Sequence, residues 1–157
     1  AALLPDDPAS STAFTGKRFT LRYPVAFRVT RAESDRGSYE DTTILDPANP
    51  SRLLRVDVSP HAAPGSPRAN AAAVVAGLRR QPGYRELDLG DVSFLGHRAL
   101  RWEFVVREGA TLVHKVDIFF RDRKGNGWAV LFQAPDAQWQ VARNPLGGAV
   151  ASLRLSP

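Results

Sequence analysis

Three pairs of oppositely charged residues, each pair separated by one position, are the side chains best placed to bind a ligand. They are Arg55/Asp57, Arg101/Glu103 and Lys115/Asp117. Each pair lies in a segment where apolar and polar residues alternate, as in a half-buried strand. Side chains at i and i+2 of a strand share one face of the sheet, so neighbouring strands would present the pairs as a cross-strand ladder of charge.

Two interpretations of this ladder remain open. It is either a solvated face held by weak ion pairs, each contributing about 0.2–1 kcal/mol, or a polar groove that recognises a ligand. For the second interpretation the candidate ligand-binding residues are Arg55, Arg101, Glu103, Lys115 and Asp117. Val105, Phe119 and Leu131 are expected on the same face, so that part of it must be covered.

The remaining residues offer little for catalysis. The chain has no cysteine, which excludes disulfides, thiolate nucleophiles and cysteine-ligated metals. His61, His97 and His114 lack the i, i+2 or i, i+4 spacing of a metal-binding pair, and neither a GxSxG nor an SxxK motif is present. We therefore expect no enzyme, no metal and no cofactor. The alternative is a small hydrolase with an acidic or histidine-based site, for which Glu103 and Asp117 are candidates, although each has a cation two residues away.

Charge and composition narrow the class of partner. The 21 Lys and Arg residues against 16 Asp and Glu residues give a net charge of +5, which favours an anionic envelope component or an acidic protein partner. Nucleic acid is disfavoured because the acids interleave with the arginines. No apolar run approaches the length of a bilayer span, so we expect membrane contact only through an anchor outside this sequence. A monomer is expected.

The elements that must position these residues follow from periodicity. Residues 1–16 are rich in Pro, Ala, Ser and Asp and are interpreted as a linker or tether, which leaves a single domain over residues 17–157. Apolar alternation predicts strands near residues 19–23, 27–29, 39–45, 54–58, 87–94, 100–106, 112–120 and 128–132. A helix after the Ser66 cap and Pro67 is predicted by the stripe Ala71, Val74, Val75, Leu78. A second helix, capped by Asp136, is expected to be interrupted at Asn144–Pro145.

Short hairpin turns between the later strands indicate an antiparallel sheet, and the helices must cover its apolar face. The predicted class is α+β, an antiparallel sheet flanked by helices. From their shared period-2 phase we expect nine core residues on one face: Leu54, Val56, Leu100, Trp102, Phe104, Val116, Ile118, Val130 and Phe132.

Three stretches together resemble the PsbP-like superfamily of α/β/α sandwiches. They are FTLRYPVAFRV at residues 19–29, LGHRALRWEFVV at 95–106 and GWAVLFQAPDAQWQVARNPLGGAVASLRL at 127–155. The superfamily includes the PsbP subunit of photosystem II, the Ran-GTP release factor and mycobacterial lipoproteins of the LpqN type. These motifs mark turns and core positions, so the resemblance carries over no functional residue.

The resemblance implies a binding or assembly role, since the superfamily shares no catalytic set. In bacteria, similar domains occur on secreted lipoproteins and on the outer side of membrane-anchored Ser/Thr kinases. We therefore expect a non-catalytic, extracytoplasmic recognition or sensor module of the bacterial cell envelope, secreted or tethered through its N-terminus.

Overall fold

The computed structural model describes residues 10–33 and 40–157, which form ten strands and two α-helices. In chain order the elements are β1 (Ser11–Thr15), β2 (Phe19–Pro24), β3 (Arg28–Glu33), β4 (Glu40–Asp46), β5 (Asn49–Ser59), α1 (Pro67–Leu78), β6 (Arg85–Phe94), β7 (His97–Glu108), β8 (Thr111–Arg121), β9 (Gly127–Pro135), a short 3₁₀ turn (Asp136–Gln138), α2 (Trp139–Ala151) and β10 (Arg154–Leu155).

The strands form two sheets, and every pairing between them is antiparallel. The large sheet has the order β3-β4-β5-β9-β8-β7-β6, and a small sheet has the order β1-β2-β10. The predicted antiparallel α+β class is confirmed, while the separate small sheet was not anticipated. Tyr39, the first residue of the strand predicted over residues 39–45, lies outside the described residues.

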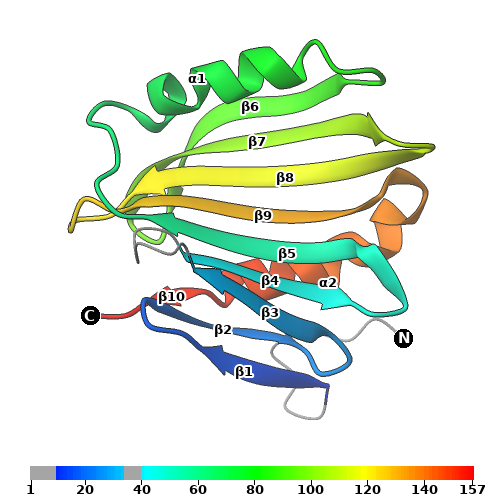
Figure 1. The fold of residues 1–157 in the computed structure, drawn as a ribbon, viewed down its shortest axis with the longest axis horizontal. Coiled ribbons are helices and arrows are strands. Elements are labelled where there is room, and N and C mark those ends of the chain that lie inside the picture. The colour runs from blue at the N-terminus through cyan, green and yellow to red at the C-terminus, as the bar shows by residue number, and fades with distance from the viewer. Residues whose placement is uncertain (1–9, 34–39) are drawn as a thin grey trace.

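The two helices pack on opposite faces of the large sheet (Figure 1). Helix α1 covers β7 and β8, where Ala71 and Val75 pack on Trp102. Helix α2 lies against β9, β5 and β2, and Leu146 belongs to the larger core cluster between the two sheets. We name the two sides of the large sheet the α1 face and the α2 face. Because each helix covers only part of its face, the uncovered parts carry the charged residues considered below.

Local signals explain where α1 begins. The hydroxyl of Ser66 accepts a hydrogen bond from the Ala69 N–H at 3.1 Å, and Pro67 occupies the first helical position, where its missing N–H costs nothing. Beyond the end of α1, Arg79 and Tyr84 both donate to the Glu86 carboxylate at 2.8 Å. Tyr84 also accepts from the Trp102 indole at 3.1 Å, so the segment after α1 is tied to the core beneath it.

Three expectations about element boundaries are wrong. The tether predicted over residues 1–16 is too long, because Ser11–Thr15 forms β1 and pairs with β2; residues 1–9 lie outside the described residues. Asp136 does not cap a helix, and its carboxylate contacts His114 instead. Pro145 lies inside α2 rather than interrupting it.

The continuous course of α2 has a packing reason. Ala142, Leu146, Ala149 and Val150 are all buried and repeat at helical spacing. An internal proline removes one backbone hydrogen bond and costs about 3 kcal/mol. Burial of this apolar stripe on the sheet offsets that cost, since each large side chain contributes about 1.5–3 kcal/mol.

All nine predicted core residues are buried, but the prediction that they share one face is wrong. Leu100, Trp102 and Phe104 point to the α1 face. The other six belong to the cluster on the α2 face: Leu54, Val56, Val116, Ile118, Val130 and Phe132. Strand β7 is buried on both faces, with Ala99 and Val105 on the α2 face, so alternation along β7 alone cannot tell one face from the other.

Candidate ligand site

The predicted charge ladder does not exist as a single surface. Arg55, Asp57, Lys115 and Asp117 lie on the α1 face, because the register places Asp117 opposite Leu131 and Leu131 opposite Arg55. Arg101 and Glu103 lie on the α2 face, opposite Ile118 and Val116. Phe119 and Leu131 share the α1 face as expected, whereas Val105 lies on the other. The five candidate residues are therefore divided between two surfaces.

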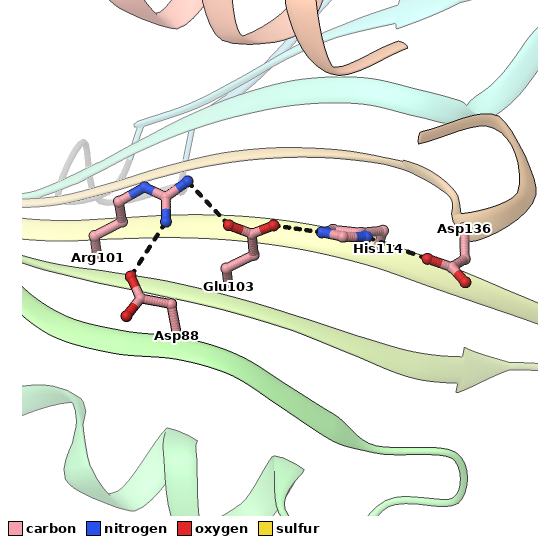
Figure 2. Close-up of polar contacts among 5 residues, drawn as sticks. All are labelled: Asp88, Arg101, Glu103, His114 and Asp136. Atoms are coloured by element: carbon pink, nitrogen blue, oxygen red, sulfur yellow. Dashed lines mark hydrogen bonds and ion pairs between the residues drawn. The ribbon is translucent and has the colours of Figure 1, made fainter. Parts of the chain in front are cut away.

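On the α2 face, Arg101 and Glu103 belong to a chain of polar contacts (Figure 2). Arg101 donates to Asp88 at 3.4 Å and to Glu103 at 3.1 Å. The second oxygen of Glu103 lies 2.7 Å from Nε2 of His114, and Nδ1 of His114 lies 3.1 Å from Asp136. The chain runs from β6 across β7 and β8 to the turn before α2.

His114 is the buried residue at the centre of this series of polar contacts. Its ring stacks on Trp139 with a centroid separation of 3.8 Å and an interplanar angle of 6°. Both ring nitrogens face carboxylates, and a neutral imidazole can donate from only one of them. Neither nitrogen is left to accept a proton from a nucleophile, so this arrangement serves structure better than general-base catalysis.

On the α1 face, three of the predicted residues lie close enough for their charges to interact. Lys115 pairs with Glu108 at 2.5 Å, and Arg55 lies 3.6 Å from Asp41. The Oδ1 atom of Asp117 is buried and has no hydrogen-bond partner among residues 10–33 and 40–157. Burial raises the pKa of Asp117 to about 7, against the opposing attraction of Lys115. This group is a mixed surface of local ion pairs and has no predominant charge.

A different group of residues forms a basic cavity of about 590 Å³. Its lining includes Pro157, and the C-terminus is marked at the left of Figure 1. The volume is in the range of small-ligand sites. Five cationic side chains and a single carboxylate, Asp122, line the cavity; the cations are Lys17, Arg18, Arg123, Lys124 and Arg154. Most of its residues come from the turns β1–β2, β6–β7 and β8–β9 and from the segment that begins with β10.

The carboxylate of Asp122 is occupied by its own turn. It accepts hydrogen bonds from the backbone N–H groups of Lys124 and Asn126, from the Asn126 amide and from the Trp128 indole, all at 2.8–2.9 Å. Burial opposes ionisation of Asp122, but these hydrogen bonds outweigh it and lower the pKa of the carboxyl. Asp122 is therefore a fixed structural anion and offers little to neutralise an incoming ligand.

Several cations of the cavity keep donors for a ligand. Arg123 is exposed and has no hydrogen-bond or ion-pair partner in the part of the chain that the structure describes. Lys124 donates to the Pro157 oxygen at 3.0 Å, and Arg154 uses one nitrogen, Nη1, for two backbone carbonyls. Arg18 is more committed, since it pairs with the buried Glu40. Guanidinium groups that keep free N–H donors suit carboxylate and phosphate ligands.

Sequence reasoning missed this cavity because its residues come from separate segments. The only local signal was the turn Asp122–Asn126, with Arg123 and Lys124 adjacent to one another. Lys17, Arg18 and Arg154 join them only because β10 pairs with β2 beside the large sheet.

Other site types find no support in the described residues. Across residues 10–33 and 40–157, no three His, Asp or Glu side chains are placed to hold a metal ion. No helix in these same ranges is long and apolar enough to cross a membrane.

Comparison with known proteins rests on structure alone, because no protein-family model and no curated protein matches the chain. Cyanobacterial PsbP (CyanoP) from Synechocystis sp. PCC 6803 aligns with a TM-score of 0.68 at 12% identity, over 96% of this chain and 95% of that one. LpqN of Mycobacterium tuberculosis aligns with a TM-score of 0.61 at 16% identity, over 100% and 90%. A putative regulator of unknown function from Pseudomonas aeruginosa gives 0.57 at 17%, over 94% and 99%.

These likenesses cover nearly the whole chain at low sequence identity, and they agree with the sandwich of α1, the antiparallel sheet and α2. The family resemblance of the three sequence stretches is thus confirmed at the level of the fold: this chain has a PsbP-like fold.

Proposed function

We propose that this chain is a non-catalytic recognition module of the bacterial cell envelope, which acts outside the cytoplasm and binds an anionic ligand in the basic cavity. The observation that carries the proposal is the cavity itself, in which five cations surround one internally satisfied carboxylate. The placement at the envelope is supported by the likeness in fold to LpqN, a protein involved in cell envelope biogenesis.

The non-catalytic part of the proposal is supported by the state of the titratable groups. Asp122 is held ionised by four hydrogen bonds, so it is poorly suited to act as a general acid near neutral pH. Outside the cavity, both nitrogens of His114 are occupied by Glu103 and Asp136. A hydrolase based on His114 would need one of those nitrogens free, which counts against that form of the competing proposal.

Isothermal titration of the chain with inorganic pyrophosphate tests the anion site. Arg123→Gln is expected to weaken binding about tenfold or more, because a hydrogen bond to a charged group contributes about 1.5–3 kcal/mol. Binding should also weaken at 0.5 M salt, since exposed charges are screened. The matched control is Arg143→Gln, which removes an exposed arginine of α2 that lies outside the cavity and should change affinity less than twofold.

Equal losses in the two variants would show that the chain attracts anions only through its net charge, and would contradict the proposed site. The envelope placement is tested separately by fractionating the native cells with an antibody against this chain. Recovery in the cytoplasmic fraction alone would contradict that part of the proposal.

A further inference from the structure

The turn between β6 and β7 places an apolar side chain in the basic cavity at a conformational cost. Leu95 has φ of 52° and is followed by Gly96 with φ of 77°. Left-handed backbone costs an L-residue about 1–2 kcal/mol, and Asn, Asp or Gly normally occupies such a turn position. Leu95 nevertheless lines the cavity.

Leu95 is part of an apolar wall beside the cations. Leu155 of β10 and Trp128 line the same cavity, and Leu95 and Leu155 are each only partly buried against the core beneath. A cavity for a small, fully hydrated anion would not need an apolar wall, because apolar side chains of the protein add to the binding free energy only when they bury apolar surface of the ligand.

We propose that the cavity takes an amphiphilic phosphate, that is, a phosphate group esterified to an alkyl chain. The phosphate is bound by Arg123, Lys124 and Arg154, and the first methylenes of the chain contact Leu95 and Leu155. Leu95 is then a residue that determines specificity. This inference rests on the proposed anion site and adds the second half of its ligand.

The test compares octyl phosphate, kept below its micellar concentration, with inorganic phosphate by isothermal titration of the full chain. The parent chain should bind octyl phosphate at least about tenfold more tightly, since each buried methylene contributes about 0.8 kcal/mol. Leu95→Asn should keep the affinity for inorganic phosphate and lose most of the preference for octyl phosphate. Asn tolerates the left-handed conformation, and retained phosphate binding reports a folded cavity.

The matched control is His61→Asn. His61 also has a left-handed backbone, with φ of 61°, but it does not line the cavity, so its replacement should leave both affinities unchanged. Vesicles of phosphatidylcholine with phosphatidic acid identify the source of the ligand. If the chain binds these vesicles and Leu95→Asn abolishes that binding, the ligand is a bilayer lipid. If the chain binds octyl phosphate but not the vesicles, the ligand is a soluble amphiphile.

The failures of the two proposals are distinguishable. If both phosphates bind equally, or if Leu95→Asn keeps the full preference for octyl phosphate, the amphiphilic ligand is overturned and the anion site stands. If neither phosphate nor pyrophosphate binds, the anion site itself is wrong.

Discussion

Trp102 and Asp117 are direct cross-strand partners on β7 and β8. The α1 face thus places a fully buried indole beside a carboxyl whose Oδ1 has no hydrogen-bond partner in the described part of the chain. Burial is the main cause that raises the pKa of Asp117 to about 7. Lys115 and Arg55 oppose the rise and Asp57 adds to it. The fold thus holds a carboxyl that is neutral in mild acid and charged above neutrality.

Asp117 should make the protein less stable as pH rises. Its pKa is about 7 in the folded chain and about 3.9 when unfolded, so between these values the native state holds one more proton than the unfolded state. Stability from this group then falls with rising pH, by up to about 1.4 kcal/mol per unit. Urea denaturation from pH 4 to 8 measures this slope. Asp117→Asn should flatten the profile and stabilise the chain at pH 8; an unchanged slope would contradict the burial of Asp117 as described.

Trp102→Ala should destabilise the chain by about 3–5 kcal/mol, the range for loss of a large buried aromatic side chain. Trp102 stacks on Phe104 with a centroid separation of 4.0 Å and binds the Tyr84 hydroxyl. Urea denaturation measures the loss. A value below about 1 kcal/mol would mean that Trp102 is not in the core, and the exposed Val141→Ala serves as the control with almost no effect.

The hairpins that join β7, β8 and β9 and the start of α1 could be predicted because each depends on local chemistry. The turns at Gly109 and Gly125 both adopt positive φ, which glycine tolerates, and Ser66 caps α1 through a bond to a residue three positions away. The face of the sheet on which a side chain lies depends also on how its strand is aligned with the neighbouring strand. Alternation within one strand does not give that alignment.

The β7–β8 hairpin contained the missing information. Glu108 pairs with Thr111, which leaves a turn of two residues, Gly109 and Ala110. Any two-residue turn pairs an even-numbered residue with an odd-numbered one. Trp102 must therefore lie opposite an odd-numbered residue such as Asp117, and never on the face of Val116 and Ile118. Turn length, combined with alternation, would have separated the three core residues of β7 from Val116 and Ile118 of β8.

His114→Phe should lower stability by about 2–3 kcal/mol, although the ring that stacks on Trp139 is retained. The variant removes the hydrogen bonds that join the His114 ring to the Glu103 and Asp136 carboxylates, which together would contribute about 3–6 kcal/mol. The expected loss is smaller because Glu103 keeps Arg101 as a partner and Asp136 is 34% exposed, so that water can replace the ring. Thermal melting together with urea denaturation measures the change. No loss at pH 7 would show that the ring does not bridge the two carboxylates in solution.

Asp122→Ala should destabilise the β8–β9 turn by about 1–3 kcal/mol, because four donors of Lys124, Asn126 and Trp128 lose their acceptor. The pKa of Asp122 is lowered in the folded chain. The ionised carboxylate therefore stabilises the fold above the unfolded pKa of about 4, and this stabilisation is lost as the pH falls through the pKa of the folded chain. The parent and the variant should therefore converge in stability as the pH is lowered through the depressed pKa of the folded chain. A constant difference down to pH 2 would contradict the ionised, hydrogen-bonded carboxylate.

Arg55→Ala and Arg101→Ala should act independently, because the two arginines lie on opposite faces of the large sheet. Arg55 contacts Thr43 and Asp41 on the α1 face, and Arg101 contacts Asp88 and Glu103 on the α2 face, so no partner is shared. The losses of stability caused by substitutions at separated sites without common partners add to within about 0.3–0.5 kcal/mol. Urea denaturation of the parent, the two single variants and the double variant gives the coupling energy directly. The charge ladder predicted from the sequence would require a coupling above that limit, since neighbouring charges on one face interact. We expect a coupling energy near zero and unchanged pyrophosphate binding in all three variants. This result would show that neither arginine belongs to the anion site, in agreement with a site in the basic cavity.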